Sequence, residues 1–163
     1  MKNQSKKRVR FITLSAIIAA LYVLLTLFSA IFGLSSGAVQ IRLSESLCAL
    51  VAFTPAAVPG LTIGCLISNL LTGANLLDVI FGTLATFLGA IGGRFLRKWD
   101  YLVPLPTILA NTIIVPLVIV YGFGVTDIGL PLVALGVFSG EIISAGIIGT
   151  GLVSILKKYN IRF

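Results

Sequence analysis

Acidic side chains stand out in a chain that is 58% hydrophobic and only 10% charged. Glu141 lies inside an apolar run that begins at Leu130, and Glu45 and Asp78 lie at the starts of two other runs. A carboxylate within an apolar span is costly to bury, so such a residue by default marks a site for an ion or a ligand. The chemistry on offer is pairing with a cation and acceptance of N–H hydrogen bonds.

Further polar residues in or beside the apolar runs could complete such a site. Arg42 precedes Glu45 by three residues, so we expect the two to pair on one helix face. Asn69 and Asn111 would either contact a ligand or form hydrogen bonds between helices. A purely structural pair of Glu141 with Asn111 is the alternative to a binding role. The candidate binding residues are therefore Arg42, Glu45, Asn69, Asp78, Asn111 and Glu141.

Several classes of chemistry have no support in the sequence. The chain has no histidine, which removes imidazole metal sites and Ser-His catalysis. No GxxxxGK[ST] motif occurs, so the chain has no P-loop for ATP hydrolysis. Cys48 and Cys65 lie within apolar runs and are interpreted as small packing residues, although a disulfide between them is possible. We expect a protein that is not an enzyme and carries no cofactor or metal.

The composition indicates a membrane protein. The mean hydropathy of +1.12 lies outside the range of soluble globular domains. The net charge of +7 would suggest nucleic acid in a soluble protein, but here the basic residues flank apolar spans. Such residues face anionic lipid and fix the orientation of the spans. We expect one integral membrane domain over residues 1–163.

Apolar runs and breaks predict an all-α bundle of six transmembrane helices. Pro55 and Pro59 interrupt the long apolar region after Leu43, because proline disfavours helix in the residue before it. The run from Phe11 to Leu34 is too long for a secretory signal, so we expect a retained helix. The predicted helices span about residues 9–32, 43–53, 56–72, 76–95, 103–121 and 130–156.

The basic residues support six crossings rather than five. Eleven of the twelve form three clusters, which six crossings place on one side with both termini, leaving only Arg42 on the other. Five crossings would expose the middle cluster outside, against the positive-inside rule. We therefore predict cytoplasmic N- and C-termini. The clusters consist of Lys2, Lys6, Lys7, Arg8 and Arg10; Arg94, Arg97 and Lys98; and Lys157, Lys158 and Arg162.

Small residues recur at four-residue spacing, which allows close approach of helix backbones. Gly89 with Gly93 is interpreted as packing within the bundle. In the first helix, Ser15, Ala16, Ala19 and Ala20 form two such pairs, and their face could instead dock a membrane partner.

The predicted topology collects four carboxylates in the outer half of the bundle, with Glu141 roughly 16 Å down its helix. That suits a small polar cation captured from outside. A single such site without an ATPase motif, together with the small-residue face, suggests a binding subunit that needs a separate motor.

Four segments resemble one family. They are VQIRLSESLCAL (39–50), PAAVPGLTIGCLISNL (55–70), DVIFGTLATFLGAIGGR (78–94) and GEIISAG (140–146). They resemble the QueT family, the queuosine-precursor S components of energy-coupling factor (ECF) transporters. The resemblance implies a six-helix S component that is a multi-pass protein of the cell membrane. It also implies a 7-deazaguanine ligand, first of all 7-aminomethyl-7-deazaguanine, and as partners a transmembrane coupling subunit and two cytoplasmic ATPase subunits.

The resemblance implies a docking face and a gate, and the depth and charge of the polar residues then suggest which of them meet the ligand. Ala16 and Ala20 match the AxxxA-type face with which S components contact the coupling subunit, and residues 33–42 would form the gate. Glu141 and Asp78 would hold the pairing edge and the amine of the ligand, in an order left open. Asn69 or Asn111 would donate to the ring carbonyl. Arg42 and Glu45 would shape the gate.

Two alternatives stay open at this point. One keeps the S-component fold with another vitamin, such as thiamine or riboflavin, as ligand. The other is a stand-alone secondary carrier in which Glu141 binds a proton.

Overall fold

A computed structural model of the chain describes residues 2–34, 40–122 and 129–160. The described residues form helices joined by turns, without a β-strand. The α-helices are α1 (Lys2–Ile31), α2 (Ala57–Leu71), α3 (Leu76–Phe95), α4 (Leu105–Leu117), α5 (Leu130–Glu141) and α6 (Gly149–Lys158). Two 3₁₀ segments, η1 (Leu43–Ala52) and η2 (Asp100–Leu102), and two π-helical segments, η3 (Val118–Gly122) and η4 (Ile142–Ile148), complete the described fold.

Four helical stretches within the described ranges are long and apolar enough to cross a membrane: Gln4–Ile31, Leu76–Phe95, Asp100–Gly122 and Leu130–Lys158. The helices η1 and α2 are also apolar but have only 10 and 15 residues. The predicted all-α membrane class is therefore confirmed. Six crossings and cytoplasmic termini stay predictions.

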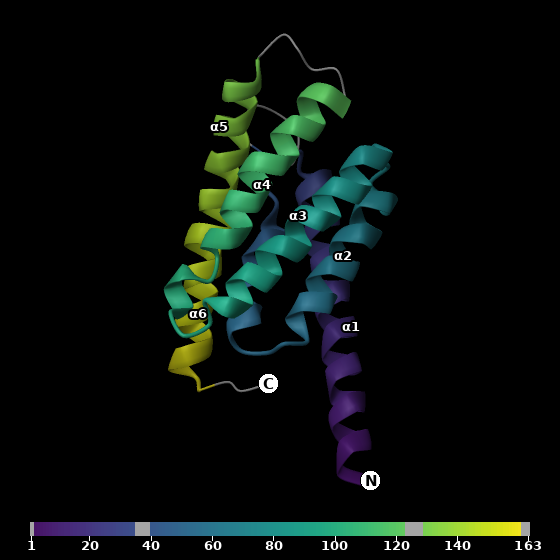
Figure 1. Ribbon diagram of the computed structural model, residues 1–163, viewed down its shortest axis with the longest axis vertical. Coiled ribbons are helices and arrows are strands. Elements are labelled where there is room, and N and C mark those ends of the chain that lie inside the picture. The colour runs from purple at the N-terminus through teal and green to yellow at the C-terminus, as the bar shows by residue number, and fades with distance from the viewer. Residues whose placement is uncertain (1, 35–39, 123–128, 161–163) are drawn as a thin grey trace.

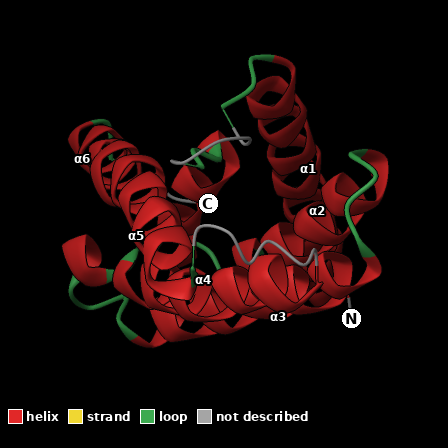
Figure 2. Ribbon diagram, turned by 90° about the horizontal axis from the view of Figure 1, so that it is seen from above, coloured by secondary structure: helices red, strands yellow, loops and turns green. Residues whose placement is uncertain are grey.

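The helices follow one another in a curved layer around η1. Successive helices from α1 to α5 pack against their neighbours, and η1 packs against α1, α3, η4 and α6. Figure 1 shows this layer from the side, and Figure 2 shows it from above. The polar residues at the start of η1 are thereby placed in the interior of the bundle.

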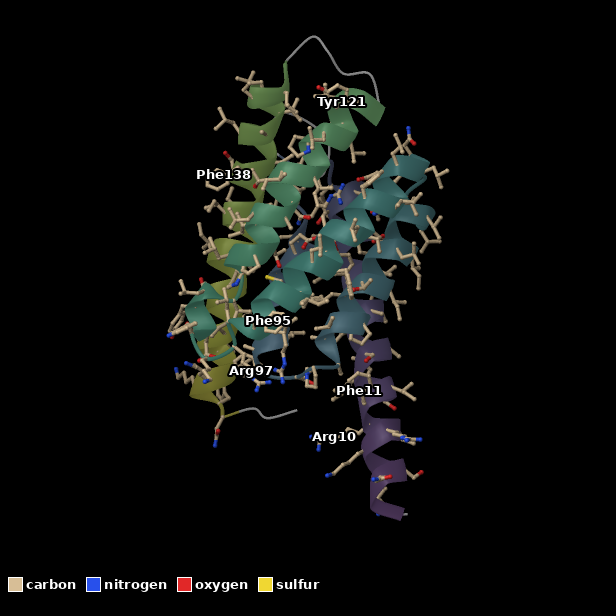
Figure 3. The ribbon with its side chains drawn as sticks, viewed as in Figure 1. Arg10, Phe11, Phe95, Arg97, Tyr121 and Phe138 are labelled. Carbon is tan, nitrogen blue, oxygen red and sulfur yellow. The ribbon has the colours of Figure 1, made fainter. Side chains whose placement is uncertain are left out.

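The basic clusters gather at one end of the bundle. The first residues of α1 and the last residues of α6 lie at the same end in Figure 1. Arg10 and Arg97 lie toward this end in Figure 3, whereas Tyr121 lies at the opposite end. The first and last helices of the bundle therefore run in opposite directions.

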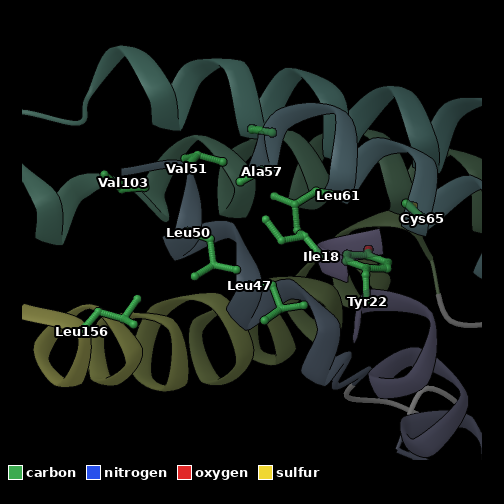
Figure 4. Close-up of a cluster of buried hydrophobic side chains, with 11 residues drawn as sticks. Ile18, Tyr22, Leu47, Leu50, Val51, Ala57, Leu61, Cys65, Val103 and Leu156 are labelled. Atoms are coloured by element: carbon green, nitrogen blue, oxygen red, sulfur yellow. The ribbon is translucent and has the colours of Figure 1, made fainter. Parts of the chain in front are cut away.

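The core lies around η1. Leu47, Leu50 and Val51 of η1 are buried against side chains of α1, α2 and α6 (Figure 4). The remaining buried members of this cluster are Ile18, Tyr22, Ala57, Leu61, Cys65, Ala90, Val103 and Leu156. A helix of this length is not stable on its own. Burial of its apolar side chains stabilises it in the bundle.

Side chains of other helices cap both ends of η1. The hydroxyl of Ser29 in α1 accepts a hydrogen bond from the backbone N–H of Leu43 at 3.0 Å. At the other end, Arg94 of α3 donates to the carbonyl oxygens of Val51 and Ala52 at 2.8 and 3.2 Å. These bonds satisfy backbone groups at the helix ends that have no partner within the helix. An unpaired backbone group away from water would cost free energy. They explain how so short an element persists inside an apolar bundle.

Several predicted helix boundaries differ from the structure. α1 already begins at Lys2 and so extends beyond the apolar run into the basic segment, where Lys6, Lys7, Arg8 and Arg10 are exposed. The predicted helix 43–53 is a 3₁₀ helix, and the predicted helix 130–156 contains the π segment η4 directly after Glu141. A π segment widens the turn, so the hydrophobic pattern alone does not reveal it.

Glycines permit the closest helix contacts. A Cβ added to Gly89 of α3 would lie 2.6 Å from the Cα atom of Thr107 in α4. A Cβ at Gly140 of α5 would overlap the backbone carbonyl of Gln40, two residues before Arg42. Gly89 thus allows close packing of α3 on α4, as predicted. Gly140 instead leaves room for the backbone of Gln40, in the segment that precedes η1.

Candidate functional site

Glu141 is buried at the end of α5 and faces α4. The side-chain amide of Asn111 donates to its Oε1 atom at 2.9 Å. The Oε2 atom of Glu141 is buried and has no hydrogen-bond partner among the described residues. The predicted pair of Glu141 and Asn111 therefore exists, but it leaves half of the carboxyl group unsatisfied.

Glu45 is buried in the first turn of η1, with 2% of its surface exposed. Its Oε1 atom accepts a hydrogen bond from the hydroxyl of Tyr22 in α1. The Asn111 side chain also lies against the Glu45 carboxyl group. Asn111 thus stands between the carboxyl groups of Glu45 and Glu141, which are close enough to interact electrostatically.

Arg42 does not pair with Glu45 as predicted. Its guanidinium forms an ion pair with Asp78 at the start of α3, with 3.5 Å between Nη2 and Oδ2. The prediction assumed helical geometry from Arg42 onward, but Arg42 is extended, with φ −106° and ψ 100°, and only caps η1. The three-residue helical spacing therefore does not apply to this pair. Glu45 still lies within electrostatic reach of Arg42.

Asn69 of α2 lies beside the Arg42–Asp78 pair. Its amide donates to the backbone carbonyl of Asp78 at 3.3 Å and to the Sγ atom of Cys65 at 3.6 Å. A Cβ added to Gly82 would lie 3.0 Å from Asp78 Oδ1 and 3.3 Å from Asn69 Nδ2. The glycine leaves room for both polar groups on that face of α3.

The six candidate residues therefore belong to connected parts of one interior. One part joins Glu45, Asn111 and Glu141, the other joins Asn69, Asp78 and Arg42, and the electrostatic contact of Arg42 with Glu45 links them. We call these six residues together with Tyr22 the polar cluster. Within the described residues, it holds three carboxyl groups but one basic side chain.

The polar cluster suits a ligand that carries positive charge and N–H donors. Buried carboxylates need a cation or hydrogen-bond donors to offset the loss of water. The described residues hold no group of three His, Cys, Asp or Glu side chains that could bind a metal ion.

Sequence reasoning missed Tyr22, Thr26 and Ser29, which form a polar stripe on α1. The hydroxyl of Thr26 donates to the hydroxyl of Ser44 in η1 at 2.9 Å, next to the Tyr22–Glu45 and Leu43–Ser29 bonds. The positions 22, 26 and 29 share one face of an α-helix. That spacing within an otherwise apolar run was the signal that could have identified them.

The cysteines are buried and free, as expected for packing residues. Cys65 accepts hydrogen bonds from Asn69 and Thr86, and Cys48 packs with Ile108 and Ala145. The possible disulfide between them is absent.

The small residues of α1 divide into an inner and an outer set. Ser15 and Ala19 are buried, and the hydroxyl of Ser15 donates to the carbonyl of Ala56 at 3.0 Å. Ala16 and Ala20 are exposed. A surface groove of about 320 Å³ between α1 and α2 includes Ser15, Ala16 and Ala19 in its lining. Ser15 and Ala19 are therefore buried toward α2, while Ala16 and Ala20 are exposed and Ala16 also lines the groove.

Comparison with known proteins identifies the family of the chain. The model of the family described as "QueT transporter" matches residues 12–158, which is nearly the whole chain. The chain belongs to the QueT transporter family. The resemblance found in the sequence is thereby confirmed at the level of the family, and the family together with the long apolar helices indicates a membrane protein.

A curated relative within the QueT family is the queuosine precursor transporter QueT of Lactococcus lactis subsp. cremoris (strain MG1363). It is 44% identical over 71 residues, which make up 44% of this chain and 41% of the relative. The aligned part thus spans less than half of that protein. No solved structure matches the chain.

Proposed function

We propose that this chain is the S component of an ECF importer and captures a 7-deazaguanine precursor of queuosine from outside the cell. The observation that carries the proposal is the polar cluster in the interior of a QueT-family bundle. Its three carboxyl groups and single arginine match a ligand that brings both a cation and N–H donors. The curated relative is named for queuosine precursors, which supports the same class of ligand.

The ligand that fits best is 7-aminomethyl-7-deazaguanine. The pairing edge of its ring offers two N–H donors in parallel, which one carboxylate can accept. Its aminomethyl group is a cation near neutral pH and requires a second carboxylate. Glu141, with its unpartnered Oε2 atom, and Asp78 are the proposed acceptors, while Asn69 or Asn111 donates to the ring carbonyl.

Arg42 and Glu45 have a supporting role in this proposal. Arg42 ends the segment 33–42 proposed as the gate, of which residues 35–39 lie outside the described residues. Its ion pair with Asp78 connects that segment to α3, so a ligand that engages Asp78 also affects the gate. Glu45 is held by Tyr22 of α1, which couples the site to the proposed docking helix.

The proposed partners are a membrane-embedded coupling subunit and two cytoplasmic ATPases. The exposed Ala16 and Ala20 form a small-residue face on α1 that another helix can approach closely. The proposed orientation in the cell membrane has both termini and the basic clusters in the cytoplasm.

Uptake experiments test this assignment. Cells that express the chain together with a coupling subunit and ATPases are expected to accumulate 7-aminomethyl-7-deazaguanine, whereas cells with the chain alone, or with ATPases unable to hydrolyse ATP, are expected not to. Uptake by the chain alone, driven by an ion gradient, would contradict the S-component assignment and support a secondary carrier.

A further inference from the structure

The polar cluster carries more acidic groups than its neighbourhood can neutralise. Asp78 is paired with Arg42, and Glu45 accepts from Tyr22, but Glu141 has only the neutral amide of Asn111 on one oxygen. The second oxygen of Glu141 is buried without a partner, and the residue is 5% exposed. A carboxylate in such surroundings would be an uncompensated charge, which is avoided by protonation.

The polar, charged and titratable groups around Glu141 belong to several elements of the bundle. Glu45 and Cys48 belong to η1, Arg42 precedes η1, and Asn111 belongs to α4. Behind these lie Tyr22 of α1, Cys65 of α2 and Asp78 of α3. Arg42 is the cation of this set and already forms an ion pair with Asp78, while the acidic Glu45 also lies within electrostatic reach of Glu141. Nothing in the described surroundings supplies a second positive charge.

We propose that Glu141 carries a proton in the empty site and that a cationic ligand takes its place. The inference rests on the proposed ligand-binding function of the polar cluster. In the exchange, the neutral carboxyl group loses its proton to solvent, and the ammonium group of the ligand pairs with the resulting carboxylate. One positive charge leaves as another enters, so the net charge of the buried cluster stays constant.

This exchange has a consequence for ligand selection. A ligand of the same ring shape without a cation cannot replace the proton, so it binds with Glu141 still neutral. The site therefore distinguishes an amine from its neutral analogue by whether a proton is released. In the pH range where the empty site is protonated and the amine is charged, affinity for the amine is expected to rise about tenfold for each pH unit.

Calorimetry on the purified full chain tests the exchange. Titration with 7-aminomethyl-7-deazaguanine in buffers of different ionisation enthalpy, such as phosphate and Tris, reports the number of protons released. The expected value is close to one per ligand. The matched ligand is 7-cyano-7-deazaguanine, which has the same ring and no cation, and its binding is expected to release close to none. This comparison needs no variant.

A Glu141→Gln variant tests the assignment to this residue. It keeps the shape and the acceptor oxygen for Asn111, and its thermal unfolding in detergent verifies that it folds. Its binding of the amine is expected to be at least about tenfold weaker and to release no proton. The Asp100→Asn variant changes an acidic residue outside the cluster and is expected to behave as the unaltered chain.

The possible failures are distinguishable. Binding of the amine with no proton release, or equal release with both ligands, overturns the exchange while the proposed function stands. Proton release retained in Glu141→Gln overturns the assignment to Glu141. A folded chain that binds neither deazaguanine contradicts the proposed function, and the exchange falls with it.

Discussion

Tyr22 connects the proposed docking helix α1 to the polar cluster. Its hydroxyl is buried and donates to Glu45, whose carboxyl group has few other donors within the described residues. A buried hydrogen bond to a charged group contributes more than one between neutral groups, and loss of the donor leaves the acceptor unsatisfied. The hydroxyl group of Tyr22 is therefore expected to stabilise the fold and to fix the position of the Glu45 side chain.

Tyr22→Phe removes that donor with little change in volume. We expect a loss of about 1 to 3 kcal/mol in the free energy of unfolding, measured by thermal or denaturant unfolding in detergent. Tyr121→Phe is the control, because Tyr121 is 78% exposed and a surface change is expected to stay within about 0.5 kcal/mol. Equal stabilities of the two variants would contradict a structural role for the Tyr22–Glu45 bond.

At the residue scale, sequence reasoning identified the acidic and amide members of the polar cluster and the pair of Glu141 with Asn111. It did not identify the partners of Arg42 and Glu45. Glu141 and Asn111 were identified because polar residues are rare in apolar runs. Tyr22 was overlooked because tyrosine also occurs as an ordinary packing or interfacial residue. The pairing of Arg42 with Asp78 was not predictable, because it depends on the extended backbone of Arg42 and on the approach of α3.

At the scale of the elements, the contact between α3 and α4 depends on Gly89. A Cβ there would meet backbone and side-chain atoms of Thr107 at 2.6 to 3.1 Å, so the helices would have to separate. This contact also fixes α4, which carries Asn111 only four residues further on. A local change at Gly89 is therefore expected to reach the site.

Gly89→Ala is expected to lower the free energy of unfolding by about 1 to 3 kcal/mol, as overpacking does in a close-packed interior. Gly151→Ala in α6 is the matched control, since nothing lies within 4 Å of the added Cβ atom. That change is expected to be neutral or to stabilise by up to about 1 kcal/mol, because alanine favours helix over glycine. Unfolding measurements on the two variants check the sign; a stabilised Gly89→Ala would contradict the packing argument.

The outer face of α1 is expected to bind the coupling subunit. A double change of Ala16 and Ala20 to leucine fills that face without touching the polar cluster. We expect loss of the co-purified coupling subunit and of uptake, with ligand affinity unchanged within about twofold. The control is Ala30→Leu, an exposed alanine on the same helix away from the groove. An intact complex in the double variant would contradict docking through this face.

The elements show where the hydrophobic pattern is informative and where it is not. The pattern predicted 76–95 for α3 and 56–72 for α2, in agreement with Leu76–Phe95 and Ala57–Leu71. It could not indicate that η1 is a 3₁₀ helix, because that depends on caps supplied by Ser29 and Arg94 from distant parts of the chain. Half of the predicted gate, residues 35–39, lies outside the described residues.

At the scale of the whole molecule, charge and polarity are separated along the bundle. The basic residues Arg10 and Arg97 lie toward one end (Figure 3). The carboxyl-bearing residues of the polar cluster are buried in the interior of the bundle. This separation suits a protein that presents one end to cytoplasmic partners and receives a ligand from the other. The account therefore depends on the polar cluster being a binding site for a cationic deazaguanine.

Direct binding to the purified chain tests that claim. Titration with 7-aminomethyl-7-deazaguanine is expected to give saturable one-to-one binding, at least about a hundredfold tighter than guanine, because guanine lacks the amine that pairs with a buried carboxylate. Thiamine, whose cation belongs to a different ring system, is expected not to bind. Equal affinity for guanine and the deazaguanine, or preferential binding of thiamine, would contradict the account.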